Sequence, residues 1–148
     1  MDRLFLDANI LFSAAYREDN LSGLRRLWDC GAELITSDYA FIEAIRNLRN
    51  KSKDLDWSLD FLYGLMRNVT LCNDLPKNGI VVFQNSLYTQ DIQLPDKDWP
   101  ILLSAITCEA THLLTGDRQH FGPLFGRDIM GVRICRPSDY LSAHDTQQ

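Results

Sequence analysis

Short apolar runs alternate with segments of helical periodicity along this chain, and this alternation limits the possible folds more than any other feature. The apolar runs cover residues 4–6, 33–36, 69–72, 112–115 and 132–135. Strands that alternate with helices are typical of a parallel sheet whose strands are joined by right-handed crossovers. We therefore expect an α/β fold with a central parallel sheet of about five strands.

Capping signals support the helices between these strands. Gly31 ends the second predicted helix, and Ser37 with Asp38 offers an N-cap for the third. The predicted helices cover residues 10–16, 22–28, 39–50 and 56–68, with one that starts within 95–100 and a short one that starts at 137. The stretch 73–94 has no clean period, although residues 80–83 look like a strand.

The composition is that of one soluble globular domain. The chain has 148 residues, of which 45% are hydrophobic and 24% are charged. We expect a single domain over residues 1–143 and a polar tail over 144–148. No apolar run approaches the ~18 residues of a membrane span, and Asp7 and Asn9 interrupt the first run in a way that excludes a signal peptide. A cytoplasmic protein that does not enter a membrane is the expectation.

The cysteines and the net charge narrow the function classes further. Cys30, Cys72, Cys108 and Cys135 lie far apart without a Cys-x-x-Cys pair, so we expect reduced thiols rather than disulfides or a zinc site. The formal net charge of -5 argues against a broad, nonspecific nucleic-acid surface, because basic residues drive such binding. A local basic rim around an acidic pocket is compatible with this charge.

Acidic residues gather at the predicted carboxyl edge of the sheet. Asp7 directly follows the first apolar run and Asp117 follows the fourth, while Asp96 and Asp98 stand where the preceding helix begins. The carboxyl ends of parallel strands meet at one edge, where α/β proteins bind ligands. Carboxylate oxygens suit Mg²⁺ or Mn²⁺, whereas zinc favours histidine or cysteine. The pattern predicts a divalent-cation site.

Each of these acids also has a purely structural interpretation. Asp7 and Asp98 can act as helix N-caps, and Asp117 can be a turn residue after Gly116. Glu43 lies nearly opposite the apolar stripe of its predicted helix, which favours a solvated face. The joint pattern of strand-end acids is therefore more informative than any single member.

Four segments together resemble the PIN domain, as found in VapC-type toxin ribonucleases. They are Leu6–Asn9, Ile42–Ala44, Leu94–Asp98 and Leu113–Asp117 followed by His120-Phe121. The resemblance covers the outer parts of the chain and hardly touches residues 55–93. It implies a three-layer α/β/α sandwich around the parallel sheet and an Mg²⁺- or Mn²⁺-dependent endoribonuclease.

The resemblance assigns roles position by position. Its acidic quartet corresponds to Asp7, Glu43, Asp98 and Asp117, of which the three aspartates would hold the metal and Glu43 would complete the site or orient water. Asn9 and Thr115 correspond to supporting positions, and Asp96 to an accessory acid. The implied reaction is hydrolysis of RNA phosphodiester bonds. The implied partners are RNA, a separate antitoxin protein and a second copy of the chain in a homodimer.

Basic and aromatic residues near these acids are candidates for substrate binding. Arg118 adjoins Asp117, and Arg46 opens a basic stretch after Glu43, although solvated surface is the alternative for both. Trp99 is expected to pack rather than stack on a base. His120 is expected to be a turn or packing residue rather than a catalyst.

Two other functions fit parts of the sequence. A phosphatase of the haloacid-dehalogenase type also begins with a strand that ends in aspartate, but its signature continues Asp-x-Asp where this chain has Asn9. A PIN module that binds RNA or protein without catalysis is the second alternative.

Overall fold

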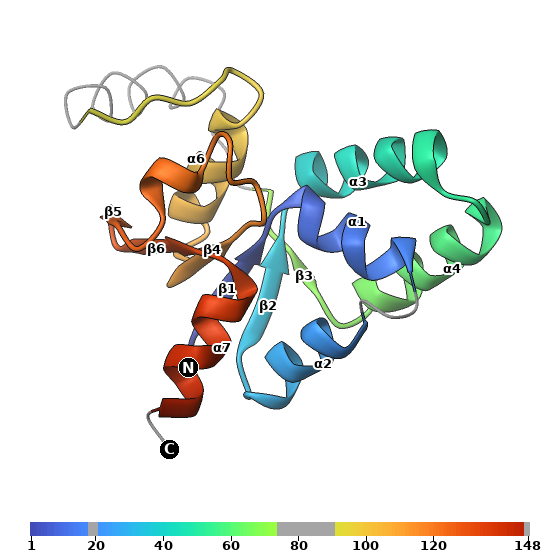
Figure 1. Cartoon of the computed structure of the whole chain (residues 1–148), viewed down its shortest axis with the longest axis horizontal. Helices are drawn as coiled ribbons and strands as arrows, with labels where there is room; N and C mark the ends of the chain where they lie inside the picture. The colour runs from blue at the N-terminus through green and yellow to red at the C-terminus, as the bar shows by residue number, and fades with distance from the viewer. Residues whose placement is uncertain (18–20, 74–90, 147–148) are drawn as a thin grey trace.

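A six-stranded sheet with the strand order β3-β2-β1-β4-β6-β5 forms the centre of the computed structural model, which describes residues 1–17, 21–73 and 91–146 (Figure 1). The strands are β1 (Arg3–Leu6), β2 (Glu33–Thr36), β3 (Thr70–Leu71), β4 (His112–Leu114), β5 (Asp128–Ile129) and β6 (Val132–Cys135). Every neighbouring pair is parallel except β5 with β6. The predicted parallel sheet is confirmed, and β5 is an additional strand.

The predicted helices are present with small shifts at their ends. They are α1 (Ala8–Tyr16), α2 (Leu21–Asp29), α3 (Asp38–Lys51), α4 (Leu55–Met66), α6 (Trp99–Thr107), the 3-10 helix η2 (Gly122–Leu124) and α7 (Pro137–Thr146). Helix α7 continues to Thr146, beyond residue 143 where a loose tail was expected. The strand-like run at 80–83 lies outside the described residues.

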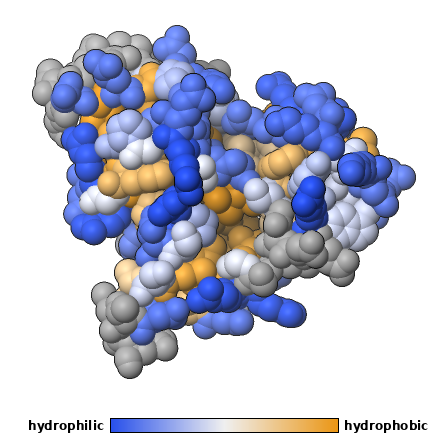
Figure 2. Space-filling view, in the orientation of Figure 1, coloured by the Kyte–Doolittle hydropathy of each residue, from blue (hydrophilic) through white to orange (hydrophobic). Residues whose placement is uncertain are grey.

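Two apolar clusters on opposite faces of the sheet give the fold three layers. Because successive residues of a strand point to opposite faces, Phe5 packs on one side and Leu4 and Leu6 pack on the other. The Phe5 side is covered by α6 and η2, and the other side by helices that include α1, α2 and α7. Hydrophobic residues gather near the middle of the visible face, and hydrophilic residues surround them (Figure 2). The expected α/β/α sandwich is confirmed.

Two of the four cysteines form a disulfide, so the expectation of reduced thiols was wrong for them. Cys72 follows β3, Cys108 caps the end of α6, and their Cα atoms lie 6.1 Å apart. Cys30 and Cys135 are free, and burial raises the pKa of the Cys135 thiol to about 11. Within the described parts of the chain, no helix has the length and apolar character needed to cross a membrane.

The strand order places a ligand-binding edge between β1 and β4. The chain moves from β1 to β2 and β3 on one side of the sheet, then returns to β4 on the other side of β1. In open α/β sheets, such a reversal opens a crevice at the carboxyl ends of the two strands. Asp7 directly follows β1, and Thr115 begins the segment that directly follows β4. The fold therefore brings both strand ends to the same edge.

Candidate functional site

A cavity of about 400 Å³ lies at this edge and is lined by acidic side chains. Asp7 comes from the end of β1, Glu43 from α3, Asp98 from the start of α6 and Asp117 from the loop after β4. The remaining lining residues include Asn9, Ser13, Asn47 and Lys97. Four carboxylates from four separate segments thus face one cavity.

Asp7 is both a helix cap and a member of this cavity. Its side chain accepts hydrogen bonds from the Ala8 amide (2.6 Å), the Thr115 hydroxyl (2.8 Å) and the Asn9 side-chain amide (3.1 Å). Burial raises the pKa of Asp7 to about 6, and the bonds from Thr115 and Ala8 offset only part of this rise. The Asn9 oxygen in turn accepts from the Gly116 amide at 2.9 Å, which ties the two strand ends together.

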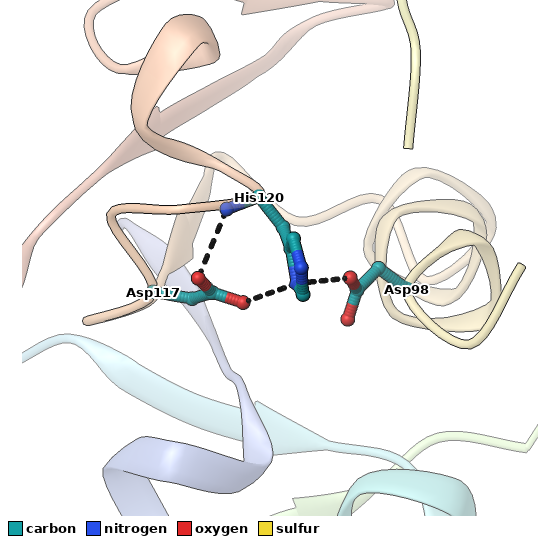
Figure 3. A group of neighbouring side chains, drawn as sticks. All are labelled: Asp98, Asp117 and His120. Carbon is teal, nitrogen blue, oxygen red and sulfur yellow. Dashed lines mark hydrogen bonds and ion pairs between the residues drawn. The ribbon is translucent and has the colours of Figure 1, made fainter. Parts of the chain in front are cut away.

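Asp98 and Asp117 meet across the imidazole of His120 (Figure 3). The Nδ1 atom of His120 lies 2.9 Å from Asp98 Oδ2 and 3.0 Å from Asp117 Oδ2. Asp98 occupies the N-cap position of α6 but makes no capping hydrogen bond with its side chain, so the capping interpretation does not hold for its carboxylate. Asp117 accepts from the His120 amide at 3.0 Å through Oδ1 and thus also serves as a turn residue.

The contact between Asp98 and His120 leaves bonding capacity in the cavity. Although the two atoms approach closely, neither Asp98 Oδ2 nor His120 Nδ1 makes a well-directed hydrogen bond, and both are buried. One ligand atom each from Asp98, Asp117 and His120 lies within 4.8 Å of the others. A buried carboxylate oxygen without a directed donor is an acceptor that a cation can satisfy.

The electrostatics of the cavity favour the binding of a divalent cation. Burial raises the pKa of Asp98, the charge of Asp117 raises it further, and His120 lowers it. Burial also raises the pKa of Glu43, as does Asp98, while Lys97 and Arg46 oppose the rise. Holding several carboxylates together is unfavourable without a compensating positive charge. Because the donors are mainly carboxylate oxygens, the set fits Mg²⁺ or Mn²⁺.

Glu43 reaches the cavity from the flank of α3, between its buried and its exposed faces, and is half-buried. The buried residues of α3 are Ala40, Ala44 and Leu48, and the centre of this stripe lies about 100° from Glu43 around the helix, so Glu43 is not opposite the core as the periodicity predicted. The solvated interpretation was therefore incomplete, because α3 starts at the carboxyl edge of the sheet and this flank borders the cavity. Asn47, one helical turn after Glu43, lines the same cavity and was missed.

Of the other predicted site residues, Thr115 contacts the acidic cluster directly, whereas the charged candidates lie on the surface. Thr115 is fully buried, and its hydroxyl donates a hydrogen bond to Asp7. Arg46 is exposed but close enough to Glu43 to influence its pKa. Asp96 and Arg118 are exposed and do not line the cavity.

His120 and Lys97 differ from the sequence interpretation, whereas Trp99 agrees with it. His120 lies between two acids rather than serving only as a turn or packing residue. Trp99 is fully buried, as expected for packing. Lys97 lines the cavity and was overlooked, although it stands between Asp96 and Asp98 in the sequence.

A second, larger cavity of about 540 Å³ lies away from the acidic cluster and is lined by Asp2, His112, Tyr140 and other residues. Its charged groups are already paired: the Tyr140 hydroxyl donates to Asp2 at 2.7 Å, and Arg133 binds Asp128 at 2.8 Å. Burial lowers the pKa of His112, which favours its neutral form. The converging carboxylates therefore lie in the smaller cavity.

Comparisons with known proteins bear on the fold. Neither a known family profile nor a curated protein sequence matches this chain. A chain of VapBC2 from Rickettsia felis, crystallised bound to a DNA fragment from their promoter, is similar with a TM-score of 0.66 and 16% identity over 90% of this chain and 98% of that chain. A chain of VapBC-1 from nontypeable Haemophilus influenzae is similar with a TM-score of 0.61 and 18% identity, and the match covers 92% of this chain and 98% of that chain. These similarities confirm the PIN-like fold that was expected.

Proposed function

We propose that this chain, which has a PIN-like fold, is a metal-dependent endoribonuclease whose catalytic carboxylates are Asp7, Glu43, Asp98 and Asp117. The observation that carries the proposal is the convergence of these four side chains, from four separate segments, on one cavity at the point where the strand order reverses. Raised pKa values mark functional sites when burial and like charges act together, as they do on Asp7, Glu43 and Asp98.

In this proposal Asp7, Asp98 and Asp117 hold Mg²⁺ or Mn²⁺. The bound cation supplies charge neutralisation for the phosphodiester, activation of water and in-line placement of the reacting groups. Thr115 and Asn9 fix the orientation of the Asp7 carboxylate through their hydrogen bonds. These bonds supply the rigid support that a catalytic ligand needs.

Glu43 is the group best suited to handle the proton of the attacking water. Burial raises its pKa, which improves its ability to accept a proton at a carboxylate oxygen. As Glu43 takes a proton from the water, the water oxygen bonds to phosphorus and the bond from phosphorus to the 3′ oxygen breaks. The departing 3′ oxygen takes up a proton from solvent, so the products carry a 5′-phosphate and a 3′-hydroxyl. Lys97, which lines the cavity, and Arg46, which acts on the charge of Glu43, are the cations available for the nonbridging oxygens.

The nuclease is better supported than the phosphatase alternative. A phosphatase of that type needs a second aspartate two residues after the first, and Asn9 stands there. The Asn9 side chain is fully used in linking Asp7, Thr115 and Gly116. A burst of phosphate from small phosphoesters without RNA cleavage would reverse this preference.

The test is cleavage of end-labelled RNA with Mn²⁺ by the wild type and by Asp7→Asn, Asp98→Asn and Asp117→Asn. Each substitution removes one charge with little change in shape, and we expect a loss of at least ~100-fold in each. Asp60→Asn, an exposed acid on α4, is the matched control and should retain activity. Undiminished metal-dependent cleavage by all three site variants would refute the proposal.

We also propose that this chain is the toxin of a cytoplasmic toxin–antitoxin pair, with a separate antitoxin protein and a homodimeric assembly. The support is the fold shared with chains of VapBC structures. Co-purification of a small protein that abolishes cleavage would support the pairing. An active purified protein whose expression does not harm its host would count against a toxin role.

A further inference from the structure

Tyr39 places an aromatic ring next to residues that line the acidic cavity. Its side chain is 39% exposed, yet its hydroxyl donates a 2.7 Å hydrogen bond to the backbone carbonyl of Lys97. Lys97 lines the cavity and immediately precedes Asp98. Tyr39 also lies one helical turn before Glu43, so both project from the same side of α3. The ring is therefore held beside two of the proposed catalytic carboxylates.

The electrostatics agree with this placement. Burial raises the pKa of the Tyr39 hydroxyl, and the charges of Glu43, Asp98 and Asp7 raise it further. Arg46 acts in the opposite direction. Tyr39 thus lies within electrostatic reach of three carboxylates that line the cavity.

The way in which Tyr39 is held distinguishes it from a core aromatic. Trp99 is fully buried in the apolar cluster beneath the cavity, whereas much of Tyr39 remains accessible. Because the hydroxyl is bound to a backbone carbonyl, the ring loses little additional freedom when a ligand packs against it. Such a ring is preorganised for a flat partner.

The outer face of α3 continues the same surface. Ile42 is 48% exposed, although burial would be favourable for an isoleucine, and Arg46 is exposed one turn further along. Tyr39, Ile42 and Arg46 have the spacing of neighbours on one helix face. This face offers an aromatic ring for a base, an apolar side chain for a sugar and a cation for a phosphate. These are the three parts of a nucleotide.

We infer that Tyr39 stacks on the base next to the phosphodiester bound in the acidic cavity and thereby positions the substrate. Bases in a duplex are already stacked on one another, whereas unpaired bases are free to pack on aromatic rings. Purines offer the larger face, so we expect a modest preference for a purine at this position. The inference rests on the proposed nuclease function and names a residue that positions the substrate at that site.

The experiment measures coupling between Tyr39 and one base of the RNA. An oligoribonucleotide with a mapped cleavage site is prepared with single abasic nucleotides on either side of that site, and kcat/KM is measured with Mn²⁺. For the wild type, one adjacent abasic position should lower kcat/KM about five- to thirty-fold, mainly through KM. Tyr39→Ala should show that loss on intact RNA and no further loss on the abasic RNA.

Two variants separate the ring from other contributions. Tyr39→Phe keeps the ring and should retain most of the activity and most of the abasic sensitivity. Tyr63→Ala removes another exposed tyrosine, 54% accessible on α4 and outside the cavity, and should behave as the wild type. If Tyr39→Ala does not fold, Tyr39→Leu retains apolar bulk without an aromatic face and should give the same loss of coupling.

The outcomes separate this inference from the proposed function. If the wild type cleaves RNA but Tyr39→Ala keeps full abasic sensitivity, the stacking role is refuted while the nuclease stands. The same holds if Tyr39→Ala weakens only the binding of a protein partner. If the wild type cleaves no RNA, the proposed function fails, and binding of RNA that contains 2-aminopurine decides the inference. Fluorescence quenching by the wild type but not by Tyr39→Ala supports stacking, whereas equal quenching or no binding overturns it.

Discussion

Replacing Asp7 by asparagine should stabilise the metal-free protein at neutral pH, although the residue is proposed to be essential for activity. Asp7 is 5% exposed, and burial raises its pKa from the ordinary value of 3.8 to about 6. The folded protein therefore binds this proton more tightly than the unfolded chain does. The stability that this tighter proton binding gives to the folded protein is fully present below about pH 3.8 and is lost as the pH rises through about 6.

The magnitude follows from the two pKa values. Linkage gives a penalty for the ionised Asp7 of about 1 kcal/mol at pH 4.5 and about 3 kcal/mol at pH 7.5. Asparagine avoids this penalty, but its amide group faces the Asn9 amide that now donates to Asp7, which costs about 1 kcal/mol. Asp7→Asn should thus raise the free energy of unfolding by about 2 kcal/mol at pH 7.5 and change it little at pH 4.5.

Urea unfolding in the presence of EDTA measures this difference directly. If the slope of the unfolding free energy with urea concentration is the same for the variant and the wild type, the shift in the urea midpoint gives the change in stability at each pH. Asp60→Asn, on the exposed surface of α4, serves as the control and should match the wild type at both pH values. A loss of stability in Asp7→Asn that is equal at pH 4.5 and 7.5 would refute the assignment of a raised pKa to Asp7.

Two further predictions concern the disulfide and His120. Cys108→Ser should lower the free energy of unfolding by about 2–4 kcal/mol, because it removes the cross-link to Cys72. Cys30→Ser changes a free cysteine and should have a much smaller effect in the same urea experiment. Equal effects of the two substitutions would exclude the disulfide. His120→Ala should destabilise the metal-free protein by about 1 kcal/mol, because Asp98 and Asp117 lose their shared partner. The same substitution should tighten Mn²⁺ binding in calorimetry, because the imidazole no longer competes with the ion for these two carboxylates. Weaker Mn²⁺ binding would instead make His120 a metal ligand.

The central strands could be predicted from the sequence because each is a buried apolar run of ordinary length. β5 could not, since it has two residues and is joined to β6 by the turn Met130-Gly131, whose positive φ angles of 50° and 87° form a tight hairpin. Methionine is not a usual residue at such a turn, so the local signal was weak. The Cys72–Cys108 pair was likewise invisible, because tertiary packing joins residues separated by 36 positions.

Some positions in the site could likewise be predicted from the sequence, and others could not. The approach of Asp7 and Asp117 was predictable because Asp7 directly follows β1, Asp117 lies in the loop just after β4, and both strands end at the same edge of the sheet. The prediction for Glu43 depended on the family resemblance, because the periodicity of α3 favoured a solvated position for it and does not encode what borders the helix. The position of His120 between Asp98 and Asp117 depends on how the loop after β4 folds back, which no spacing in the sequence encodes.

The most direct test of the central claim is the position of Mn²⁺ in crystals soaked with the ion and measured by anomalous scattering. We expect an anomalous peak within the cavity lined by Asp7, Glu43, Asp98 and Asp117. The peak should be absent from Asp98→Asn crystals soaked in the same way. At saturating Mn²⁺, ordered water alone in the wild-type cavity, or a peak only at another site, would contradict it.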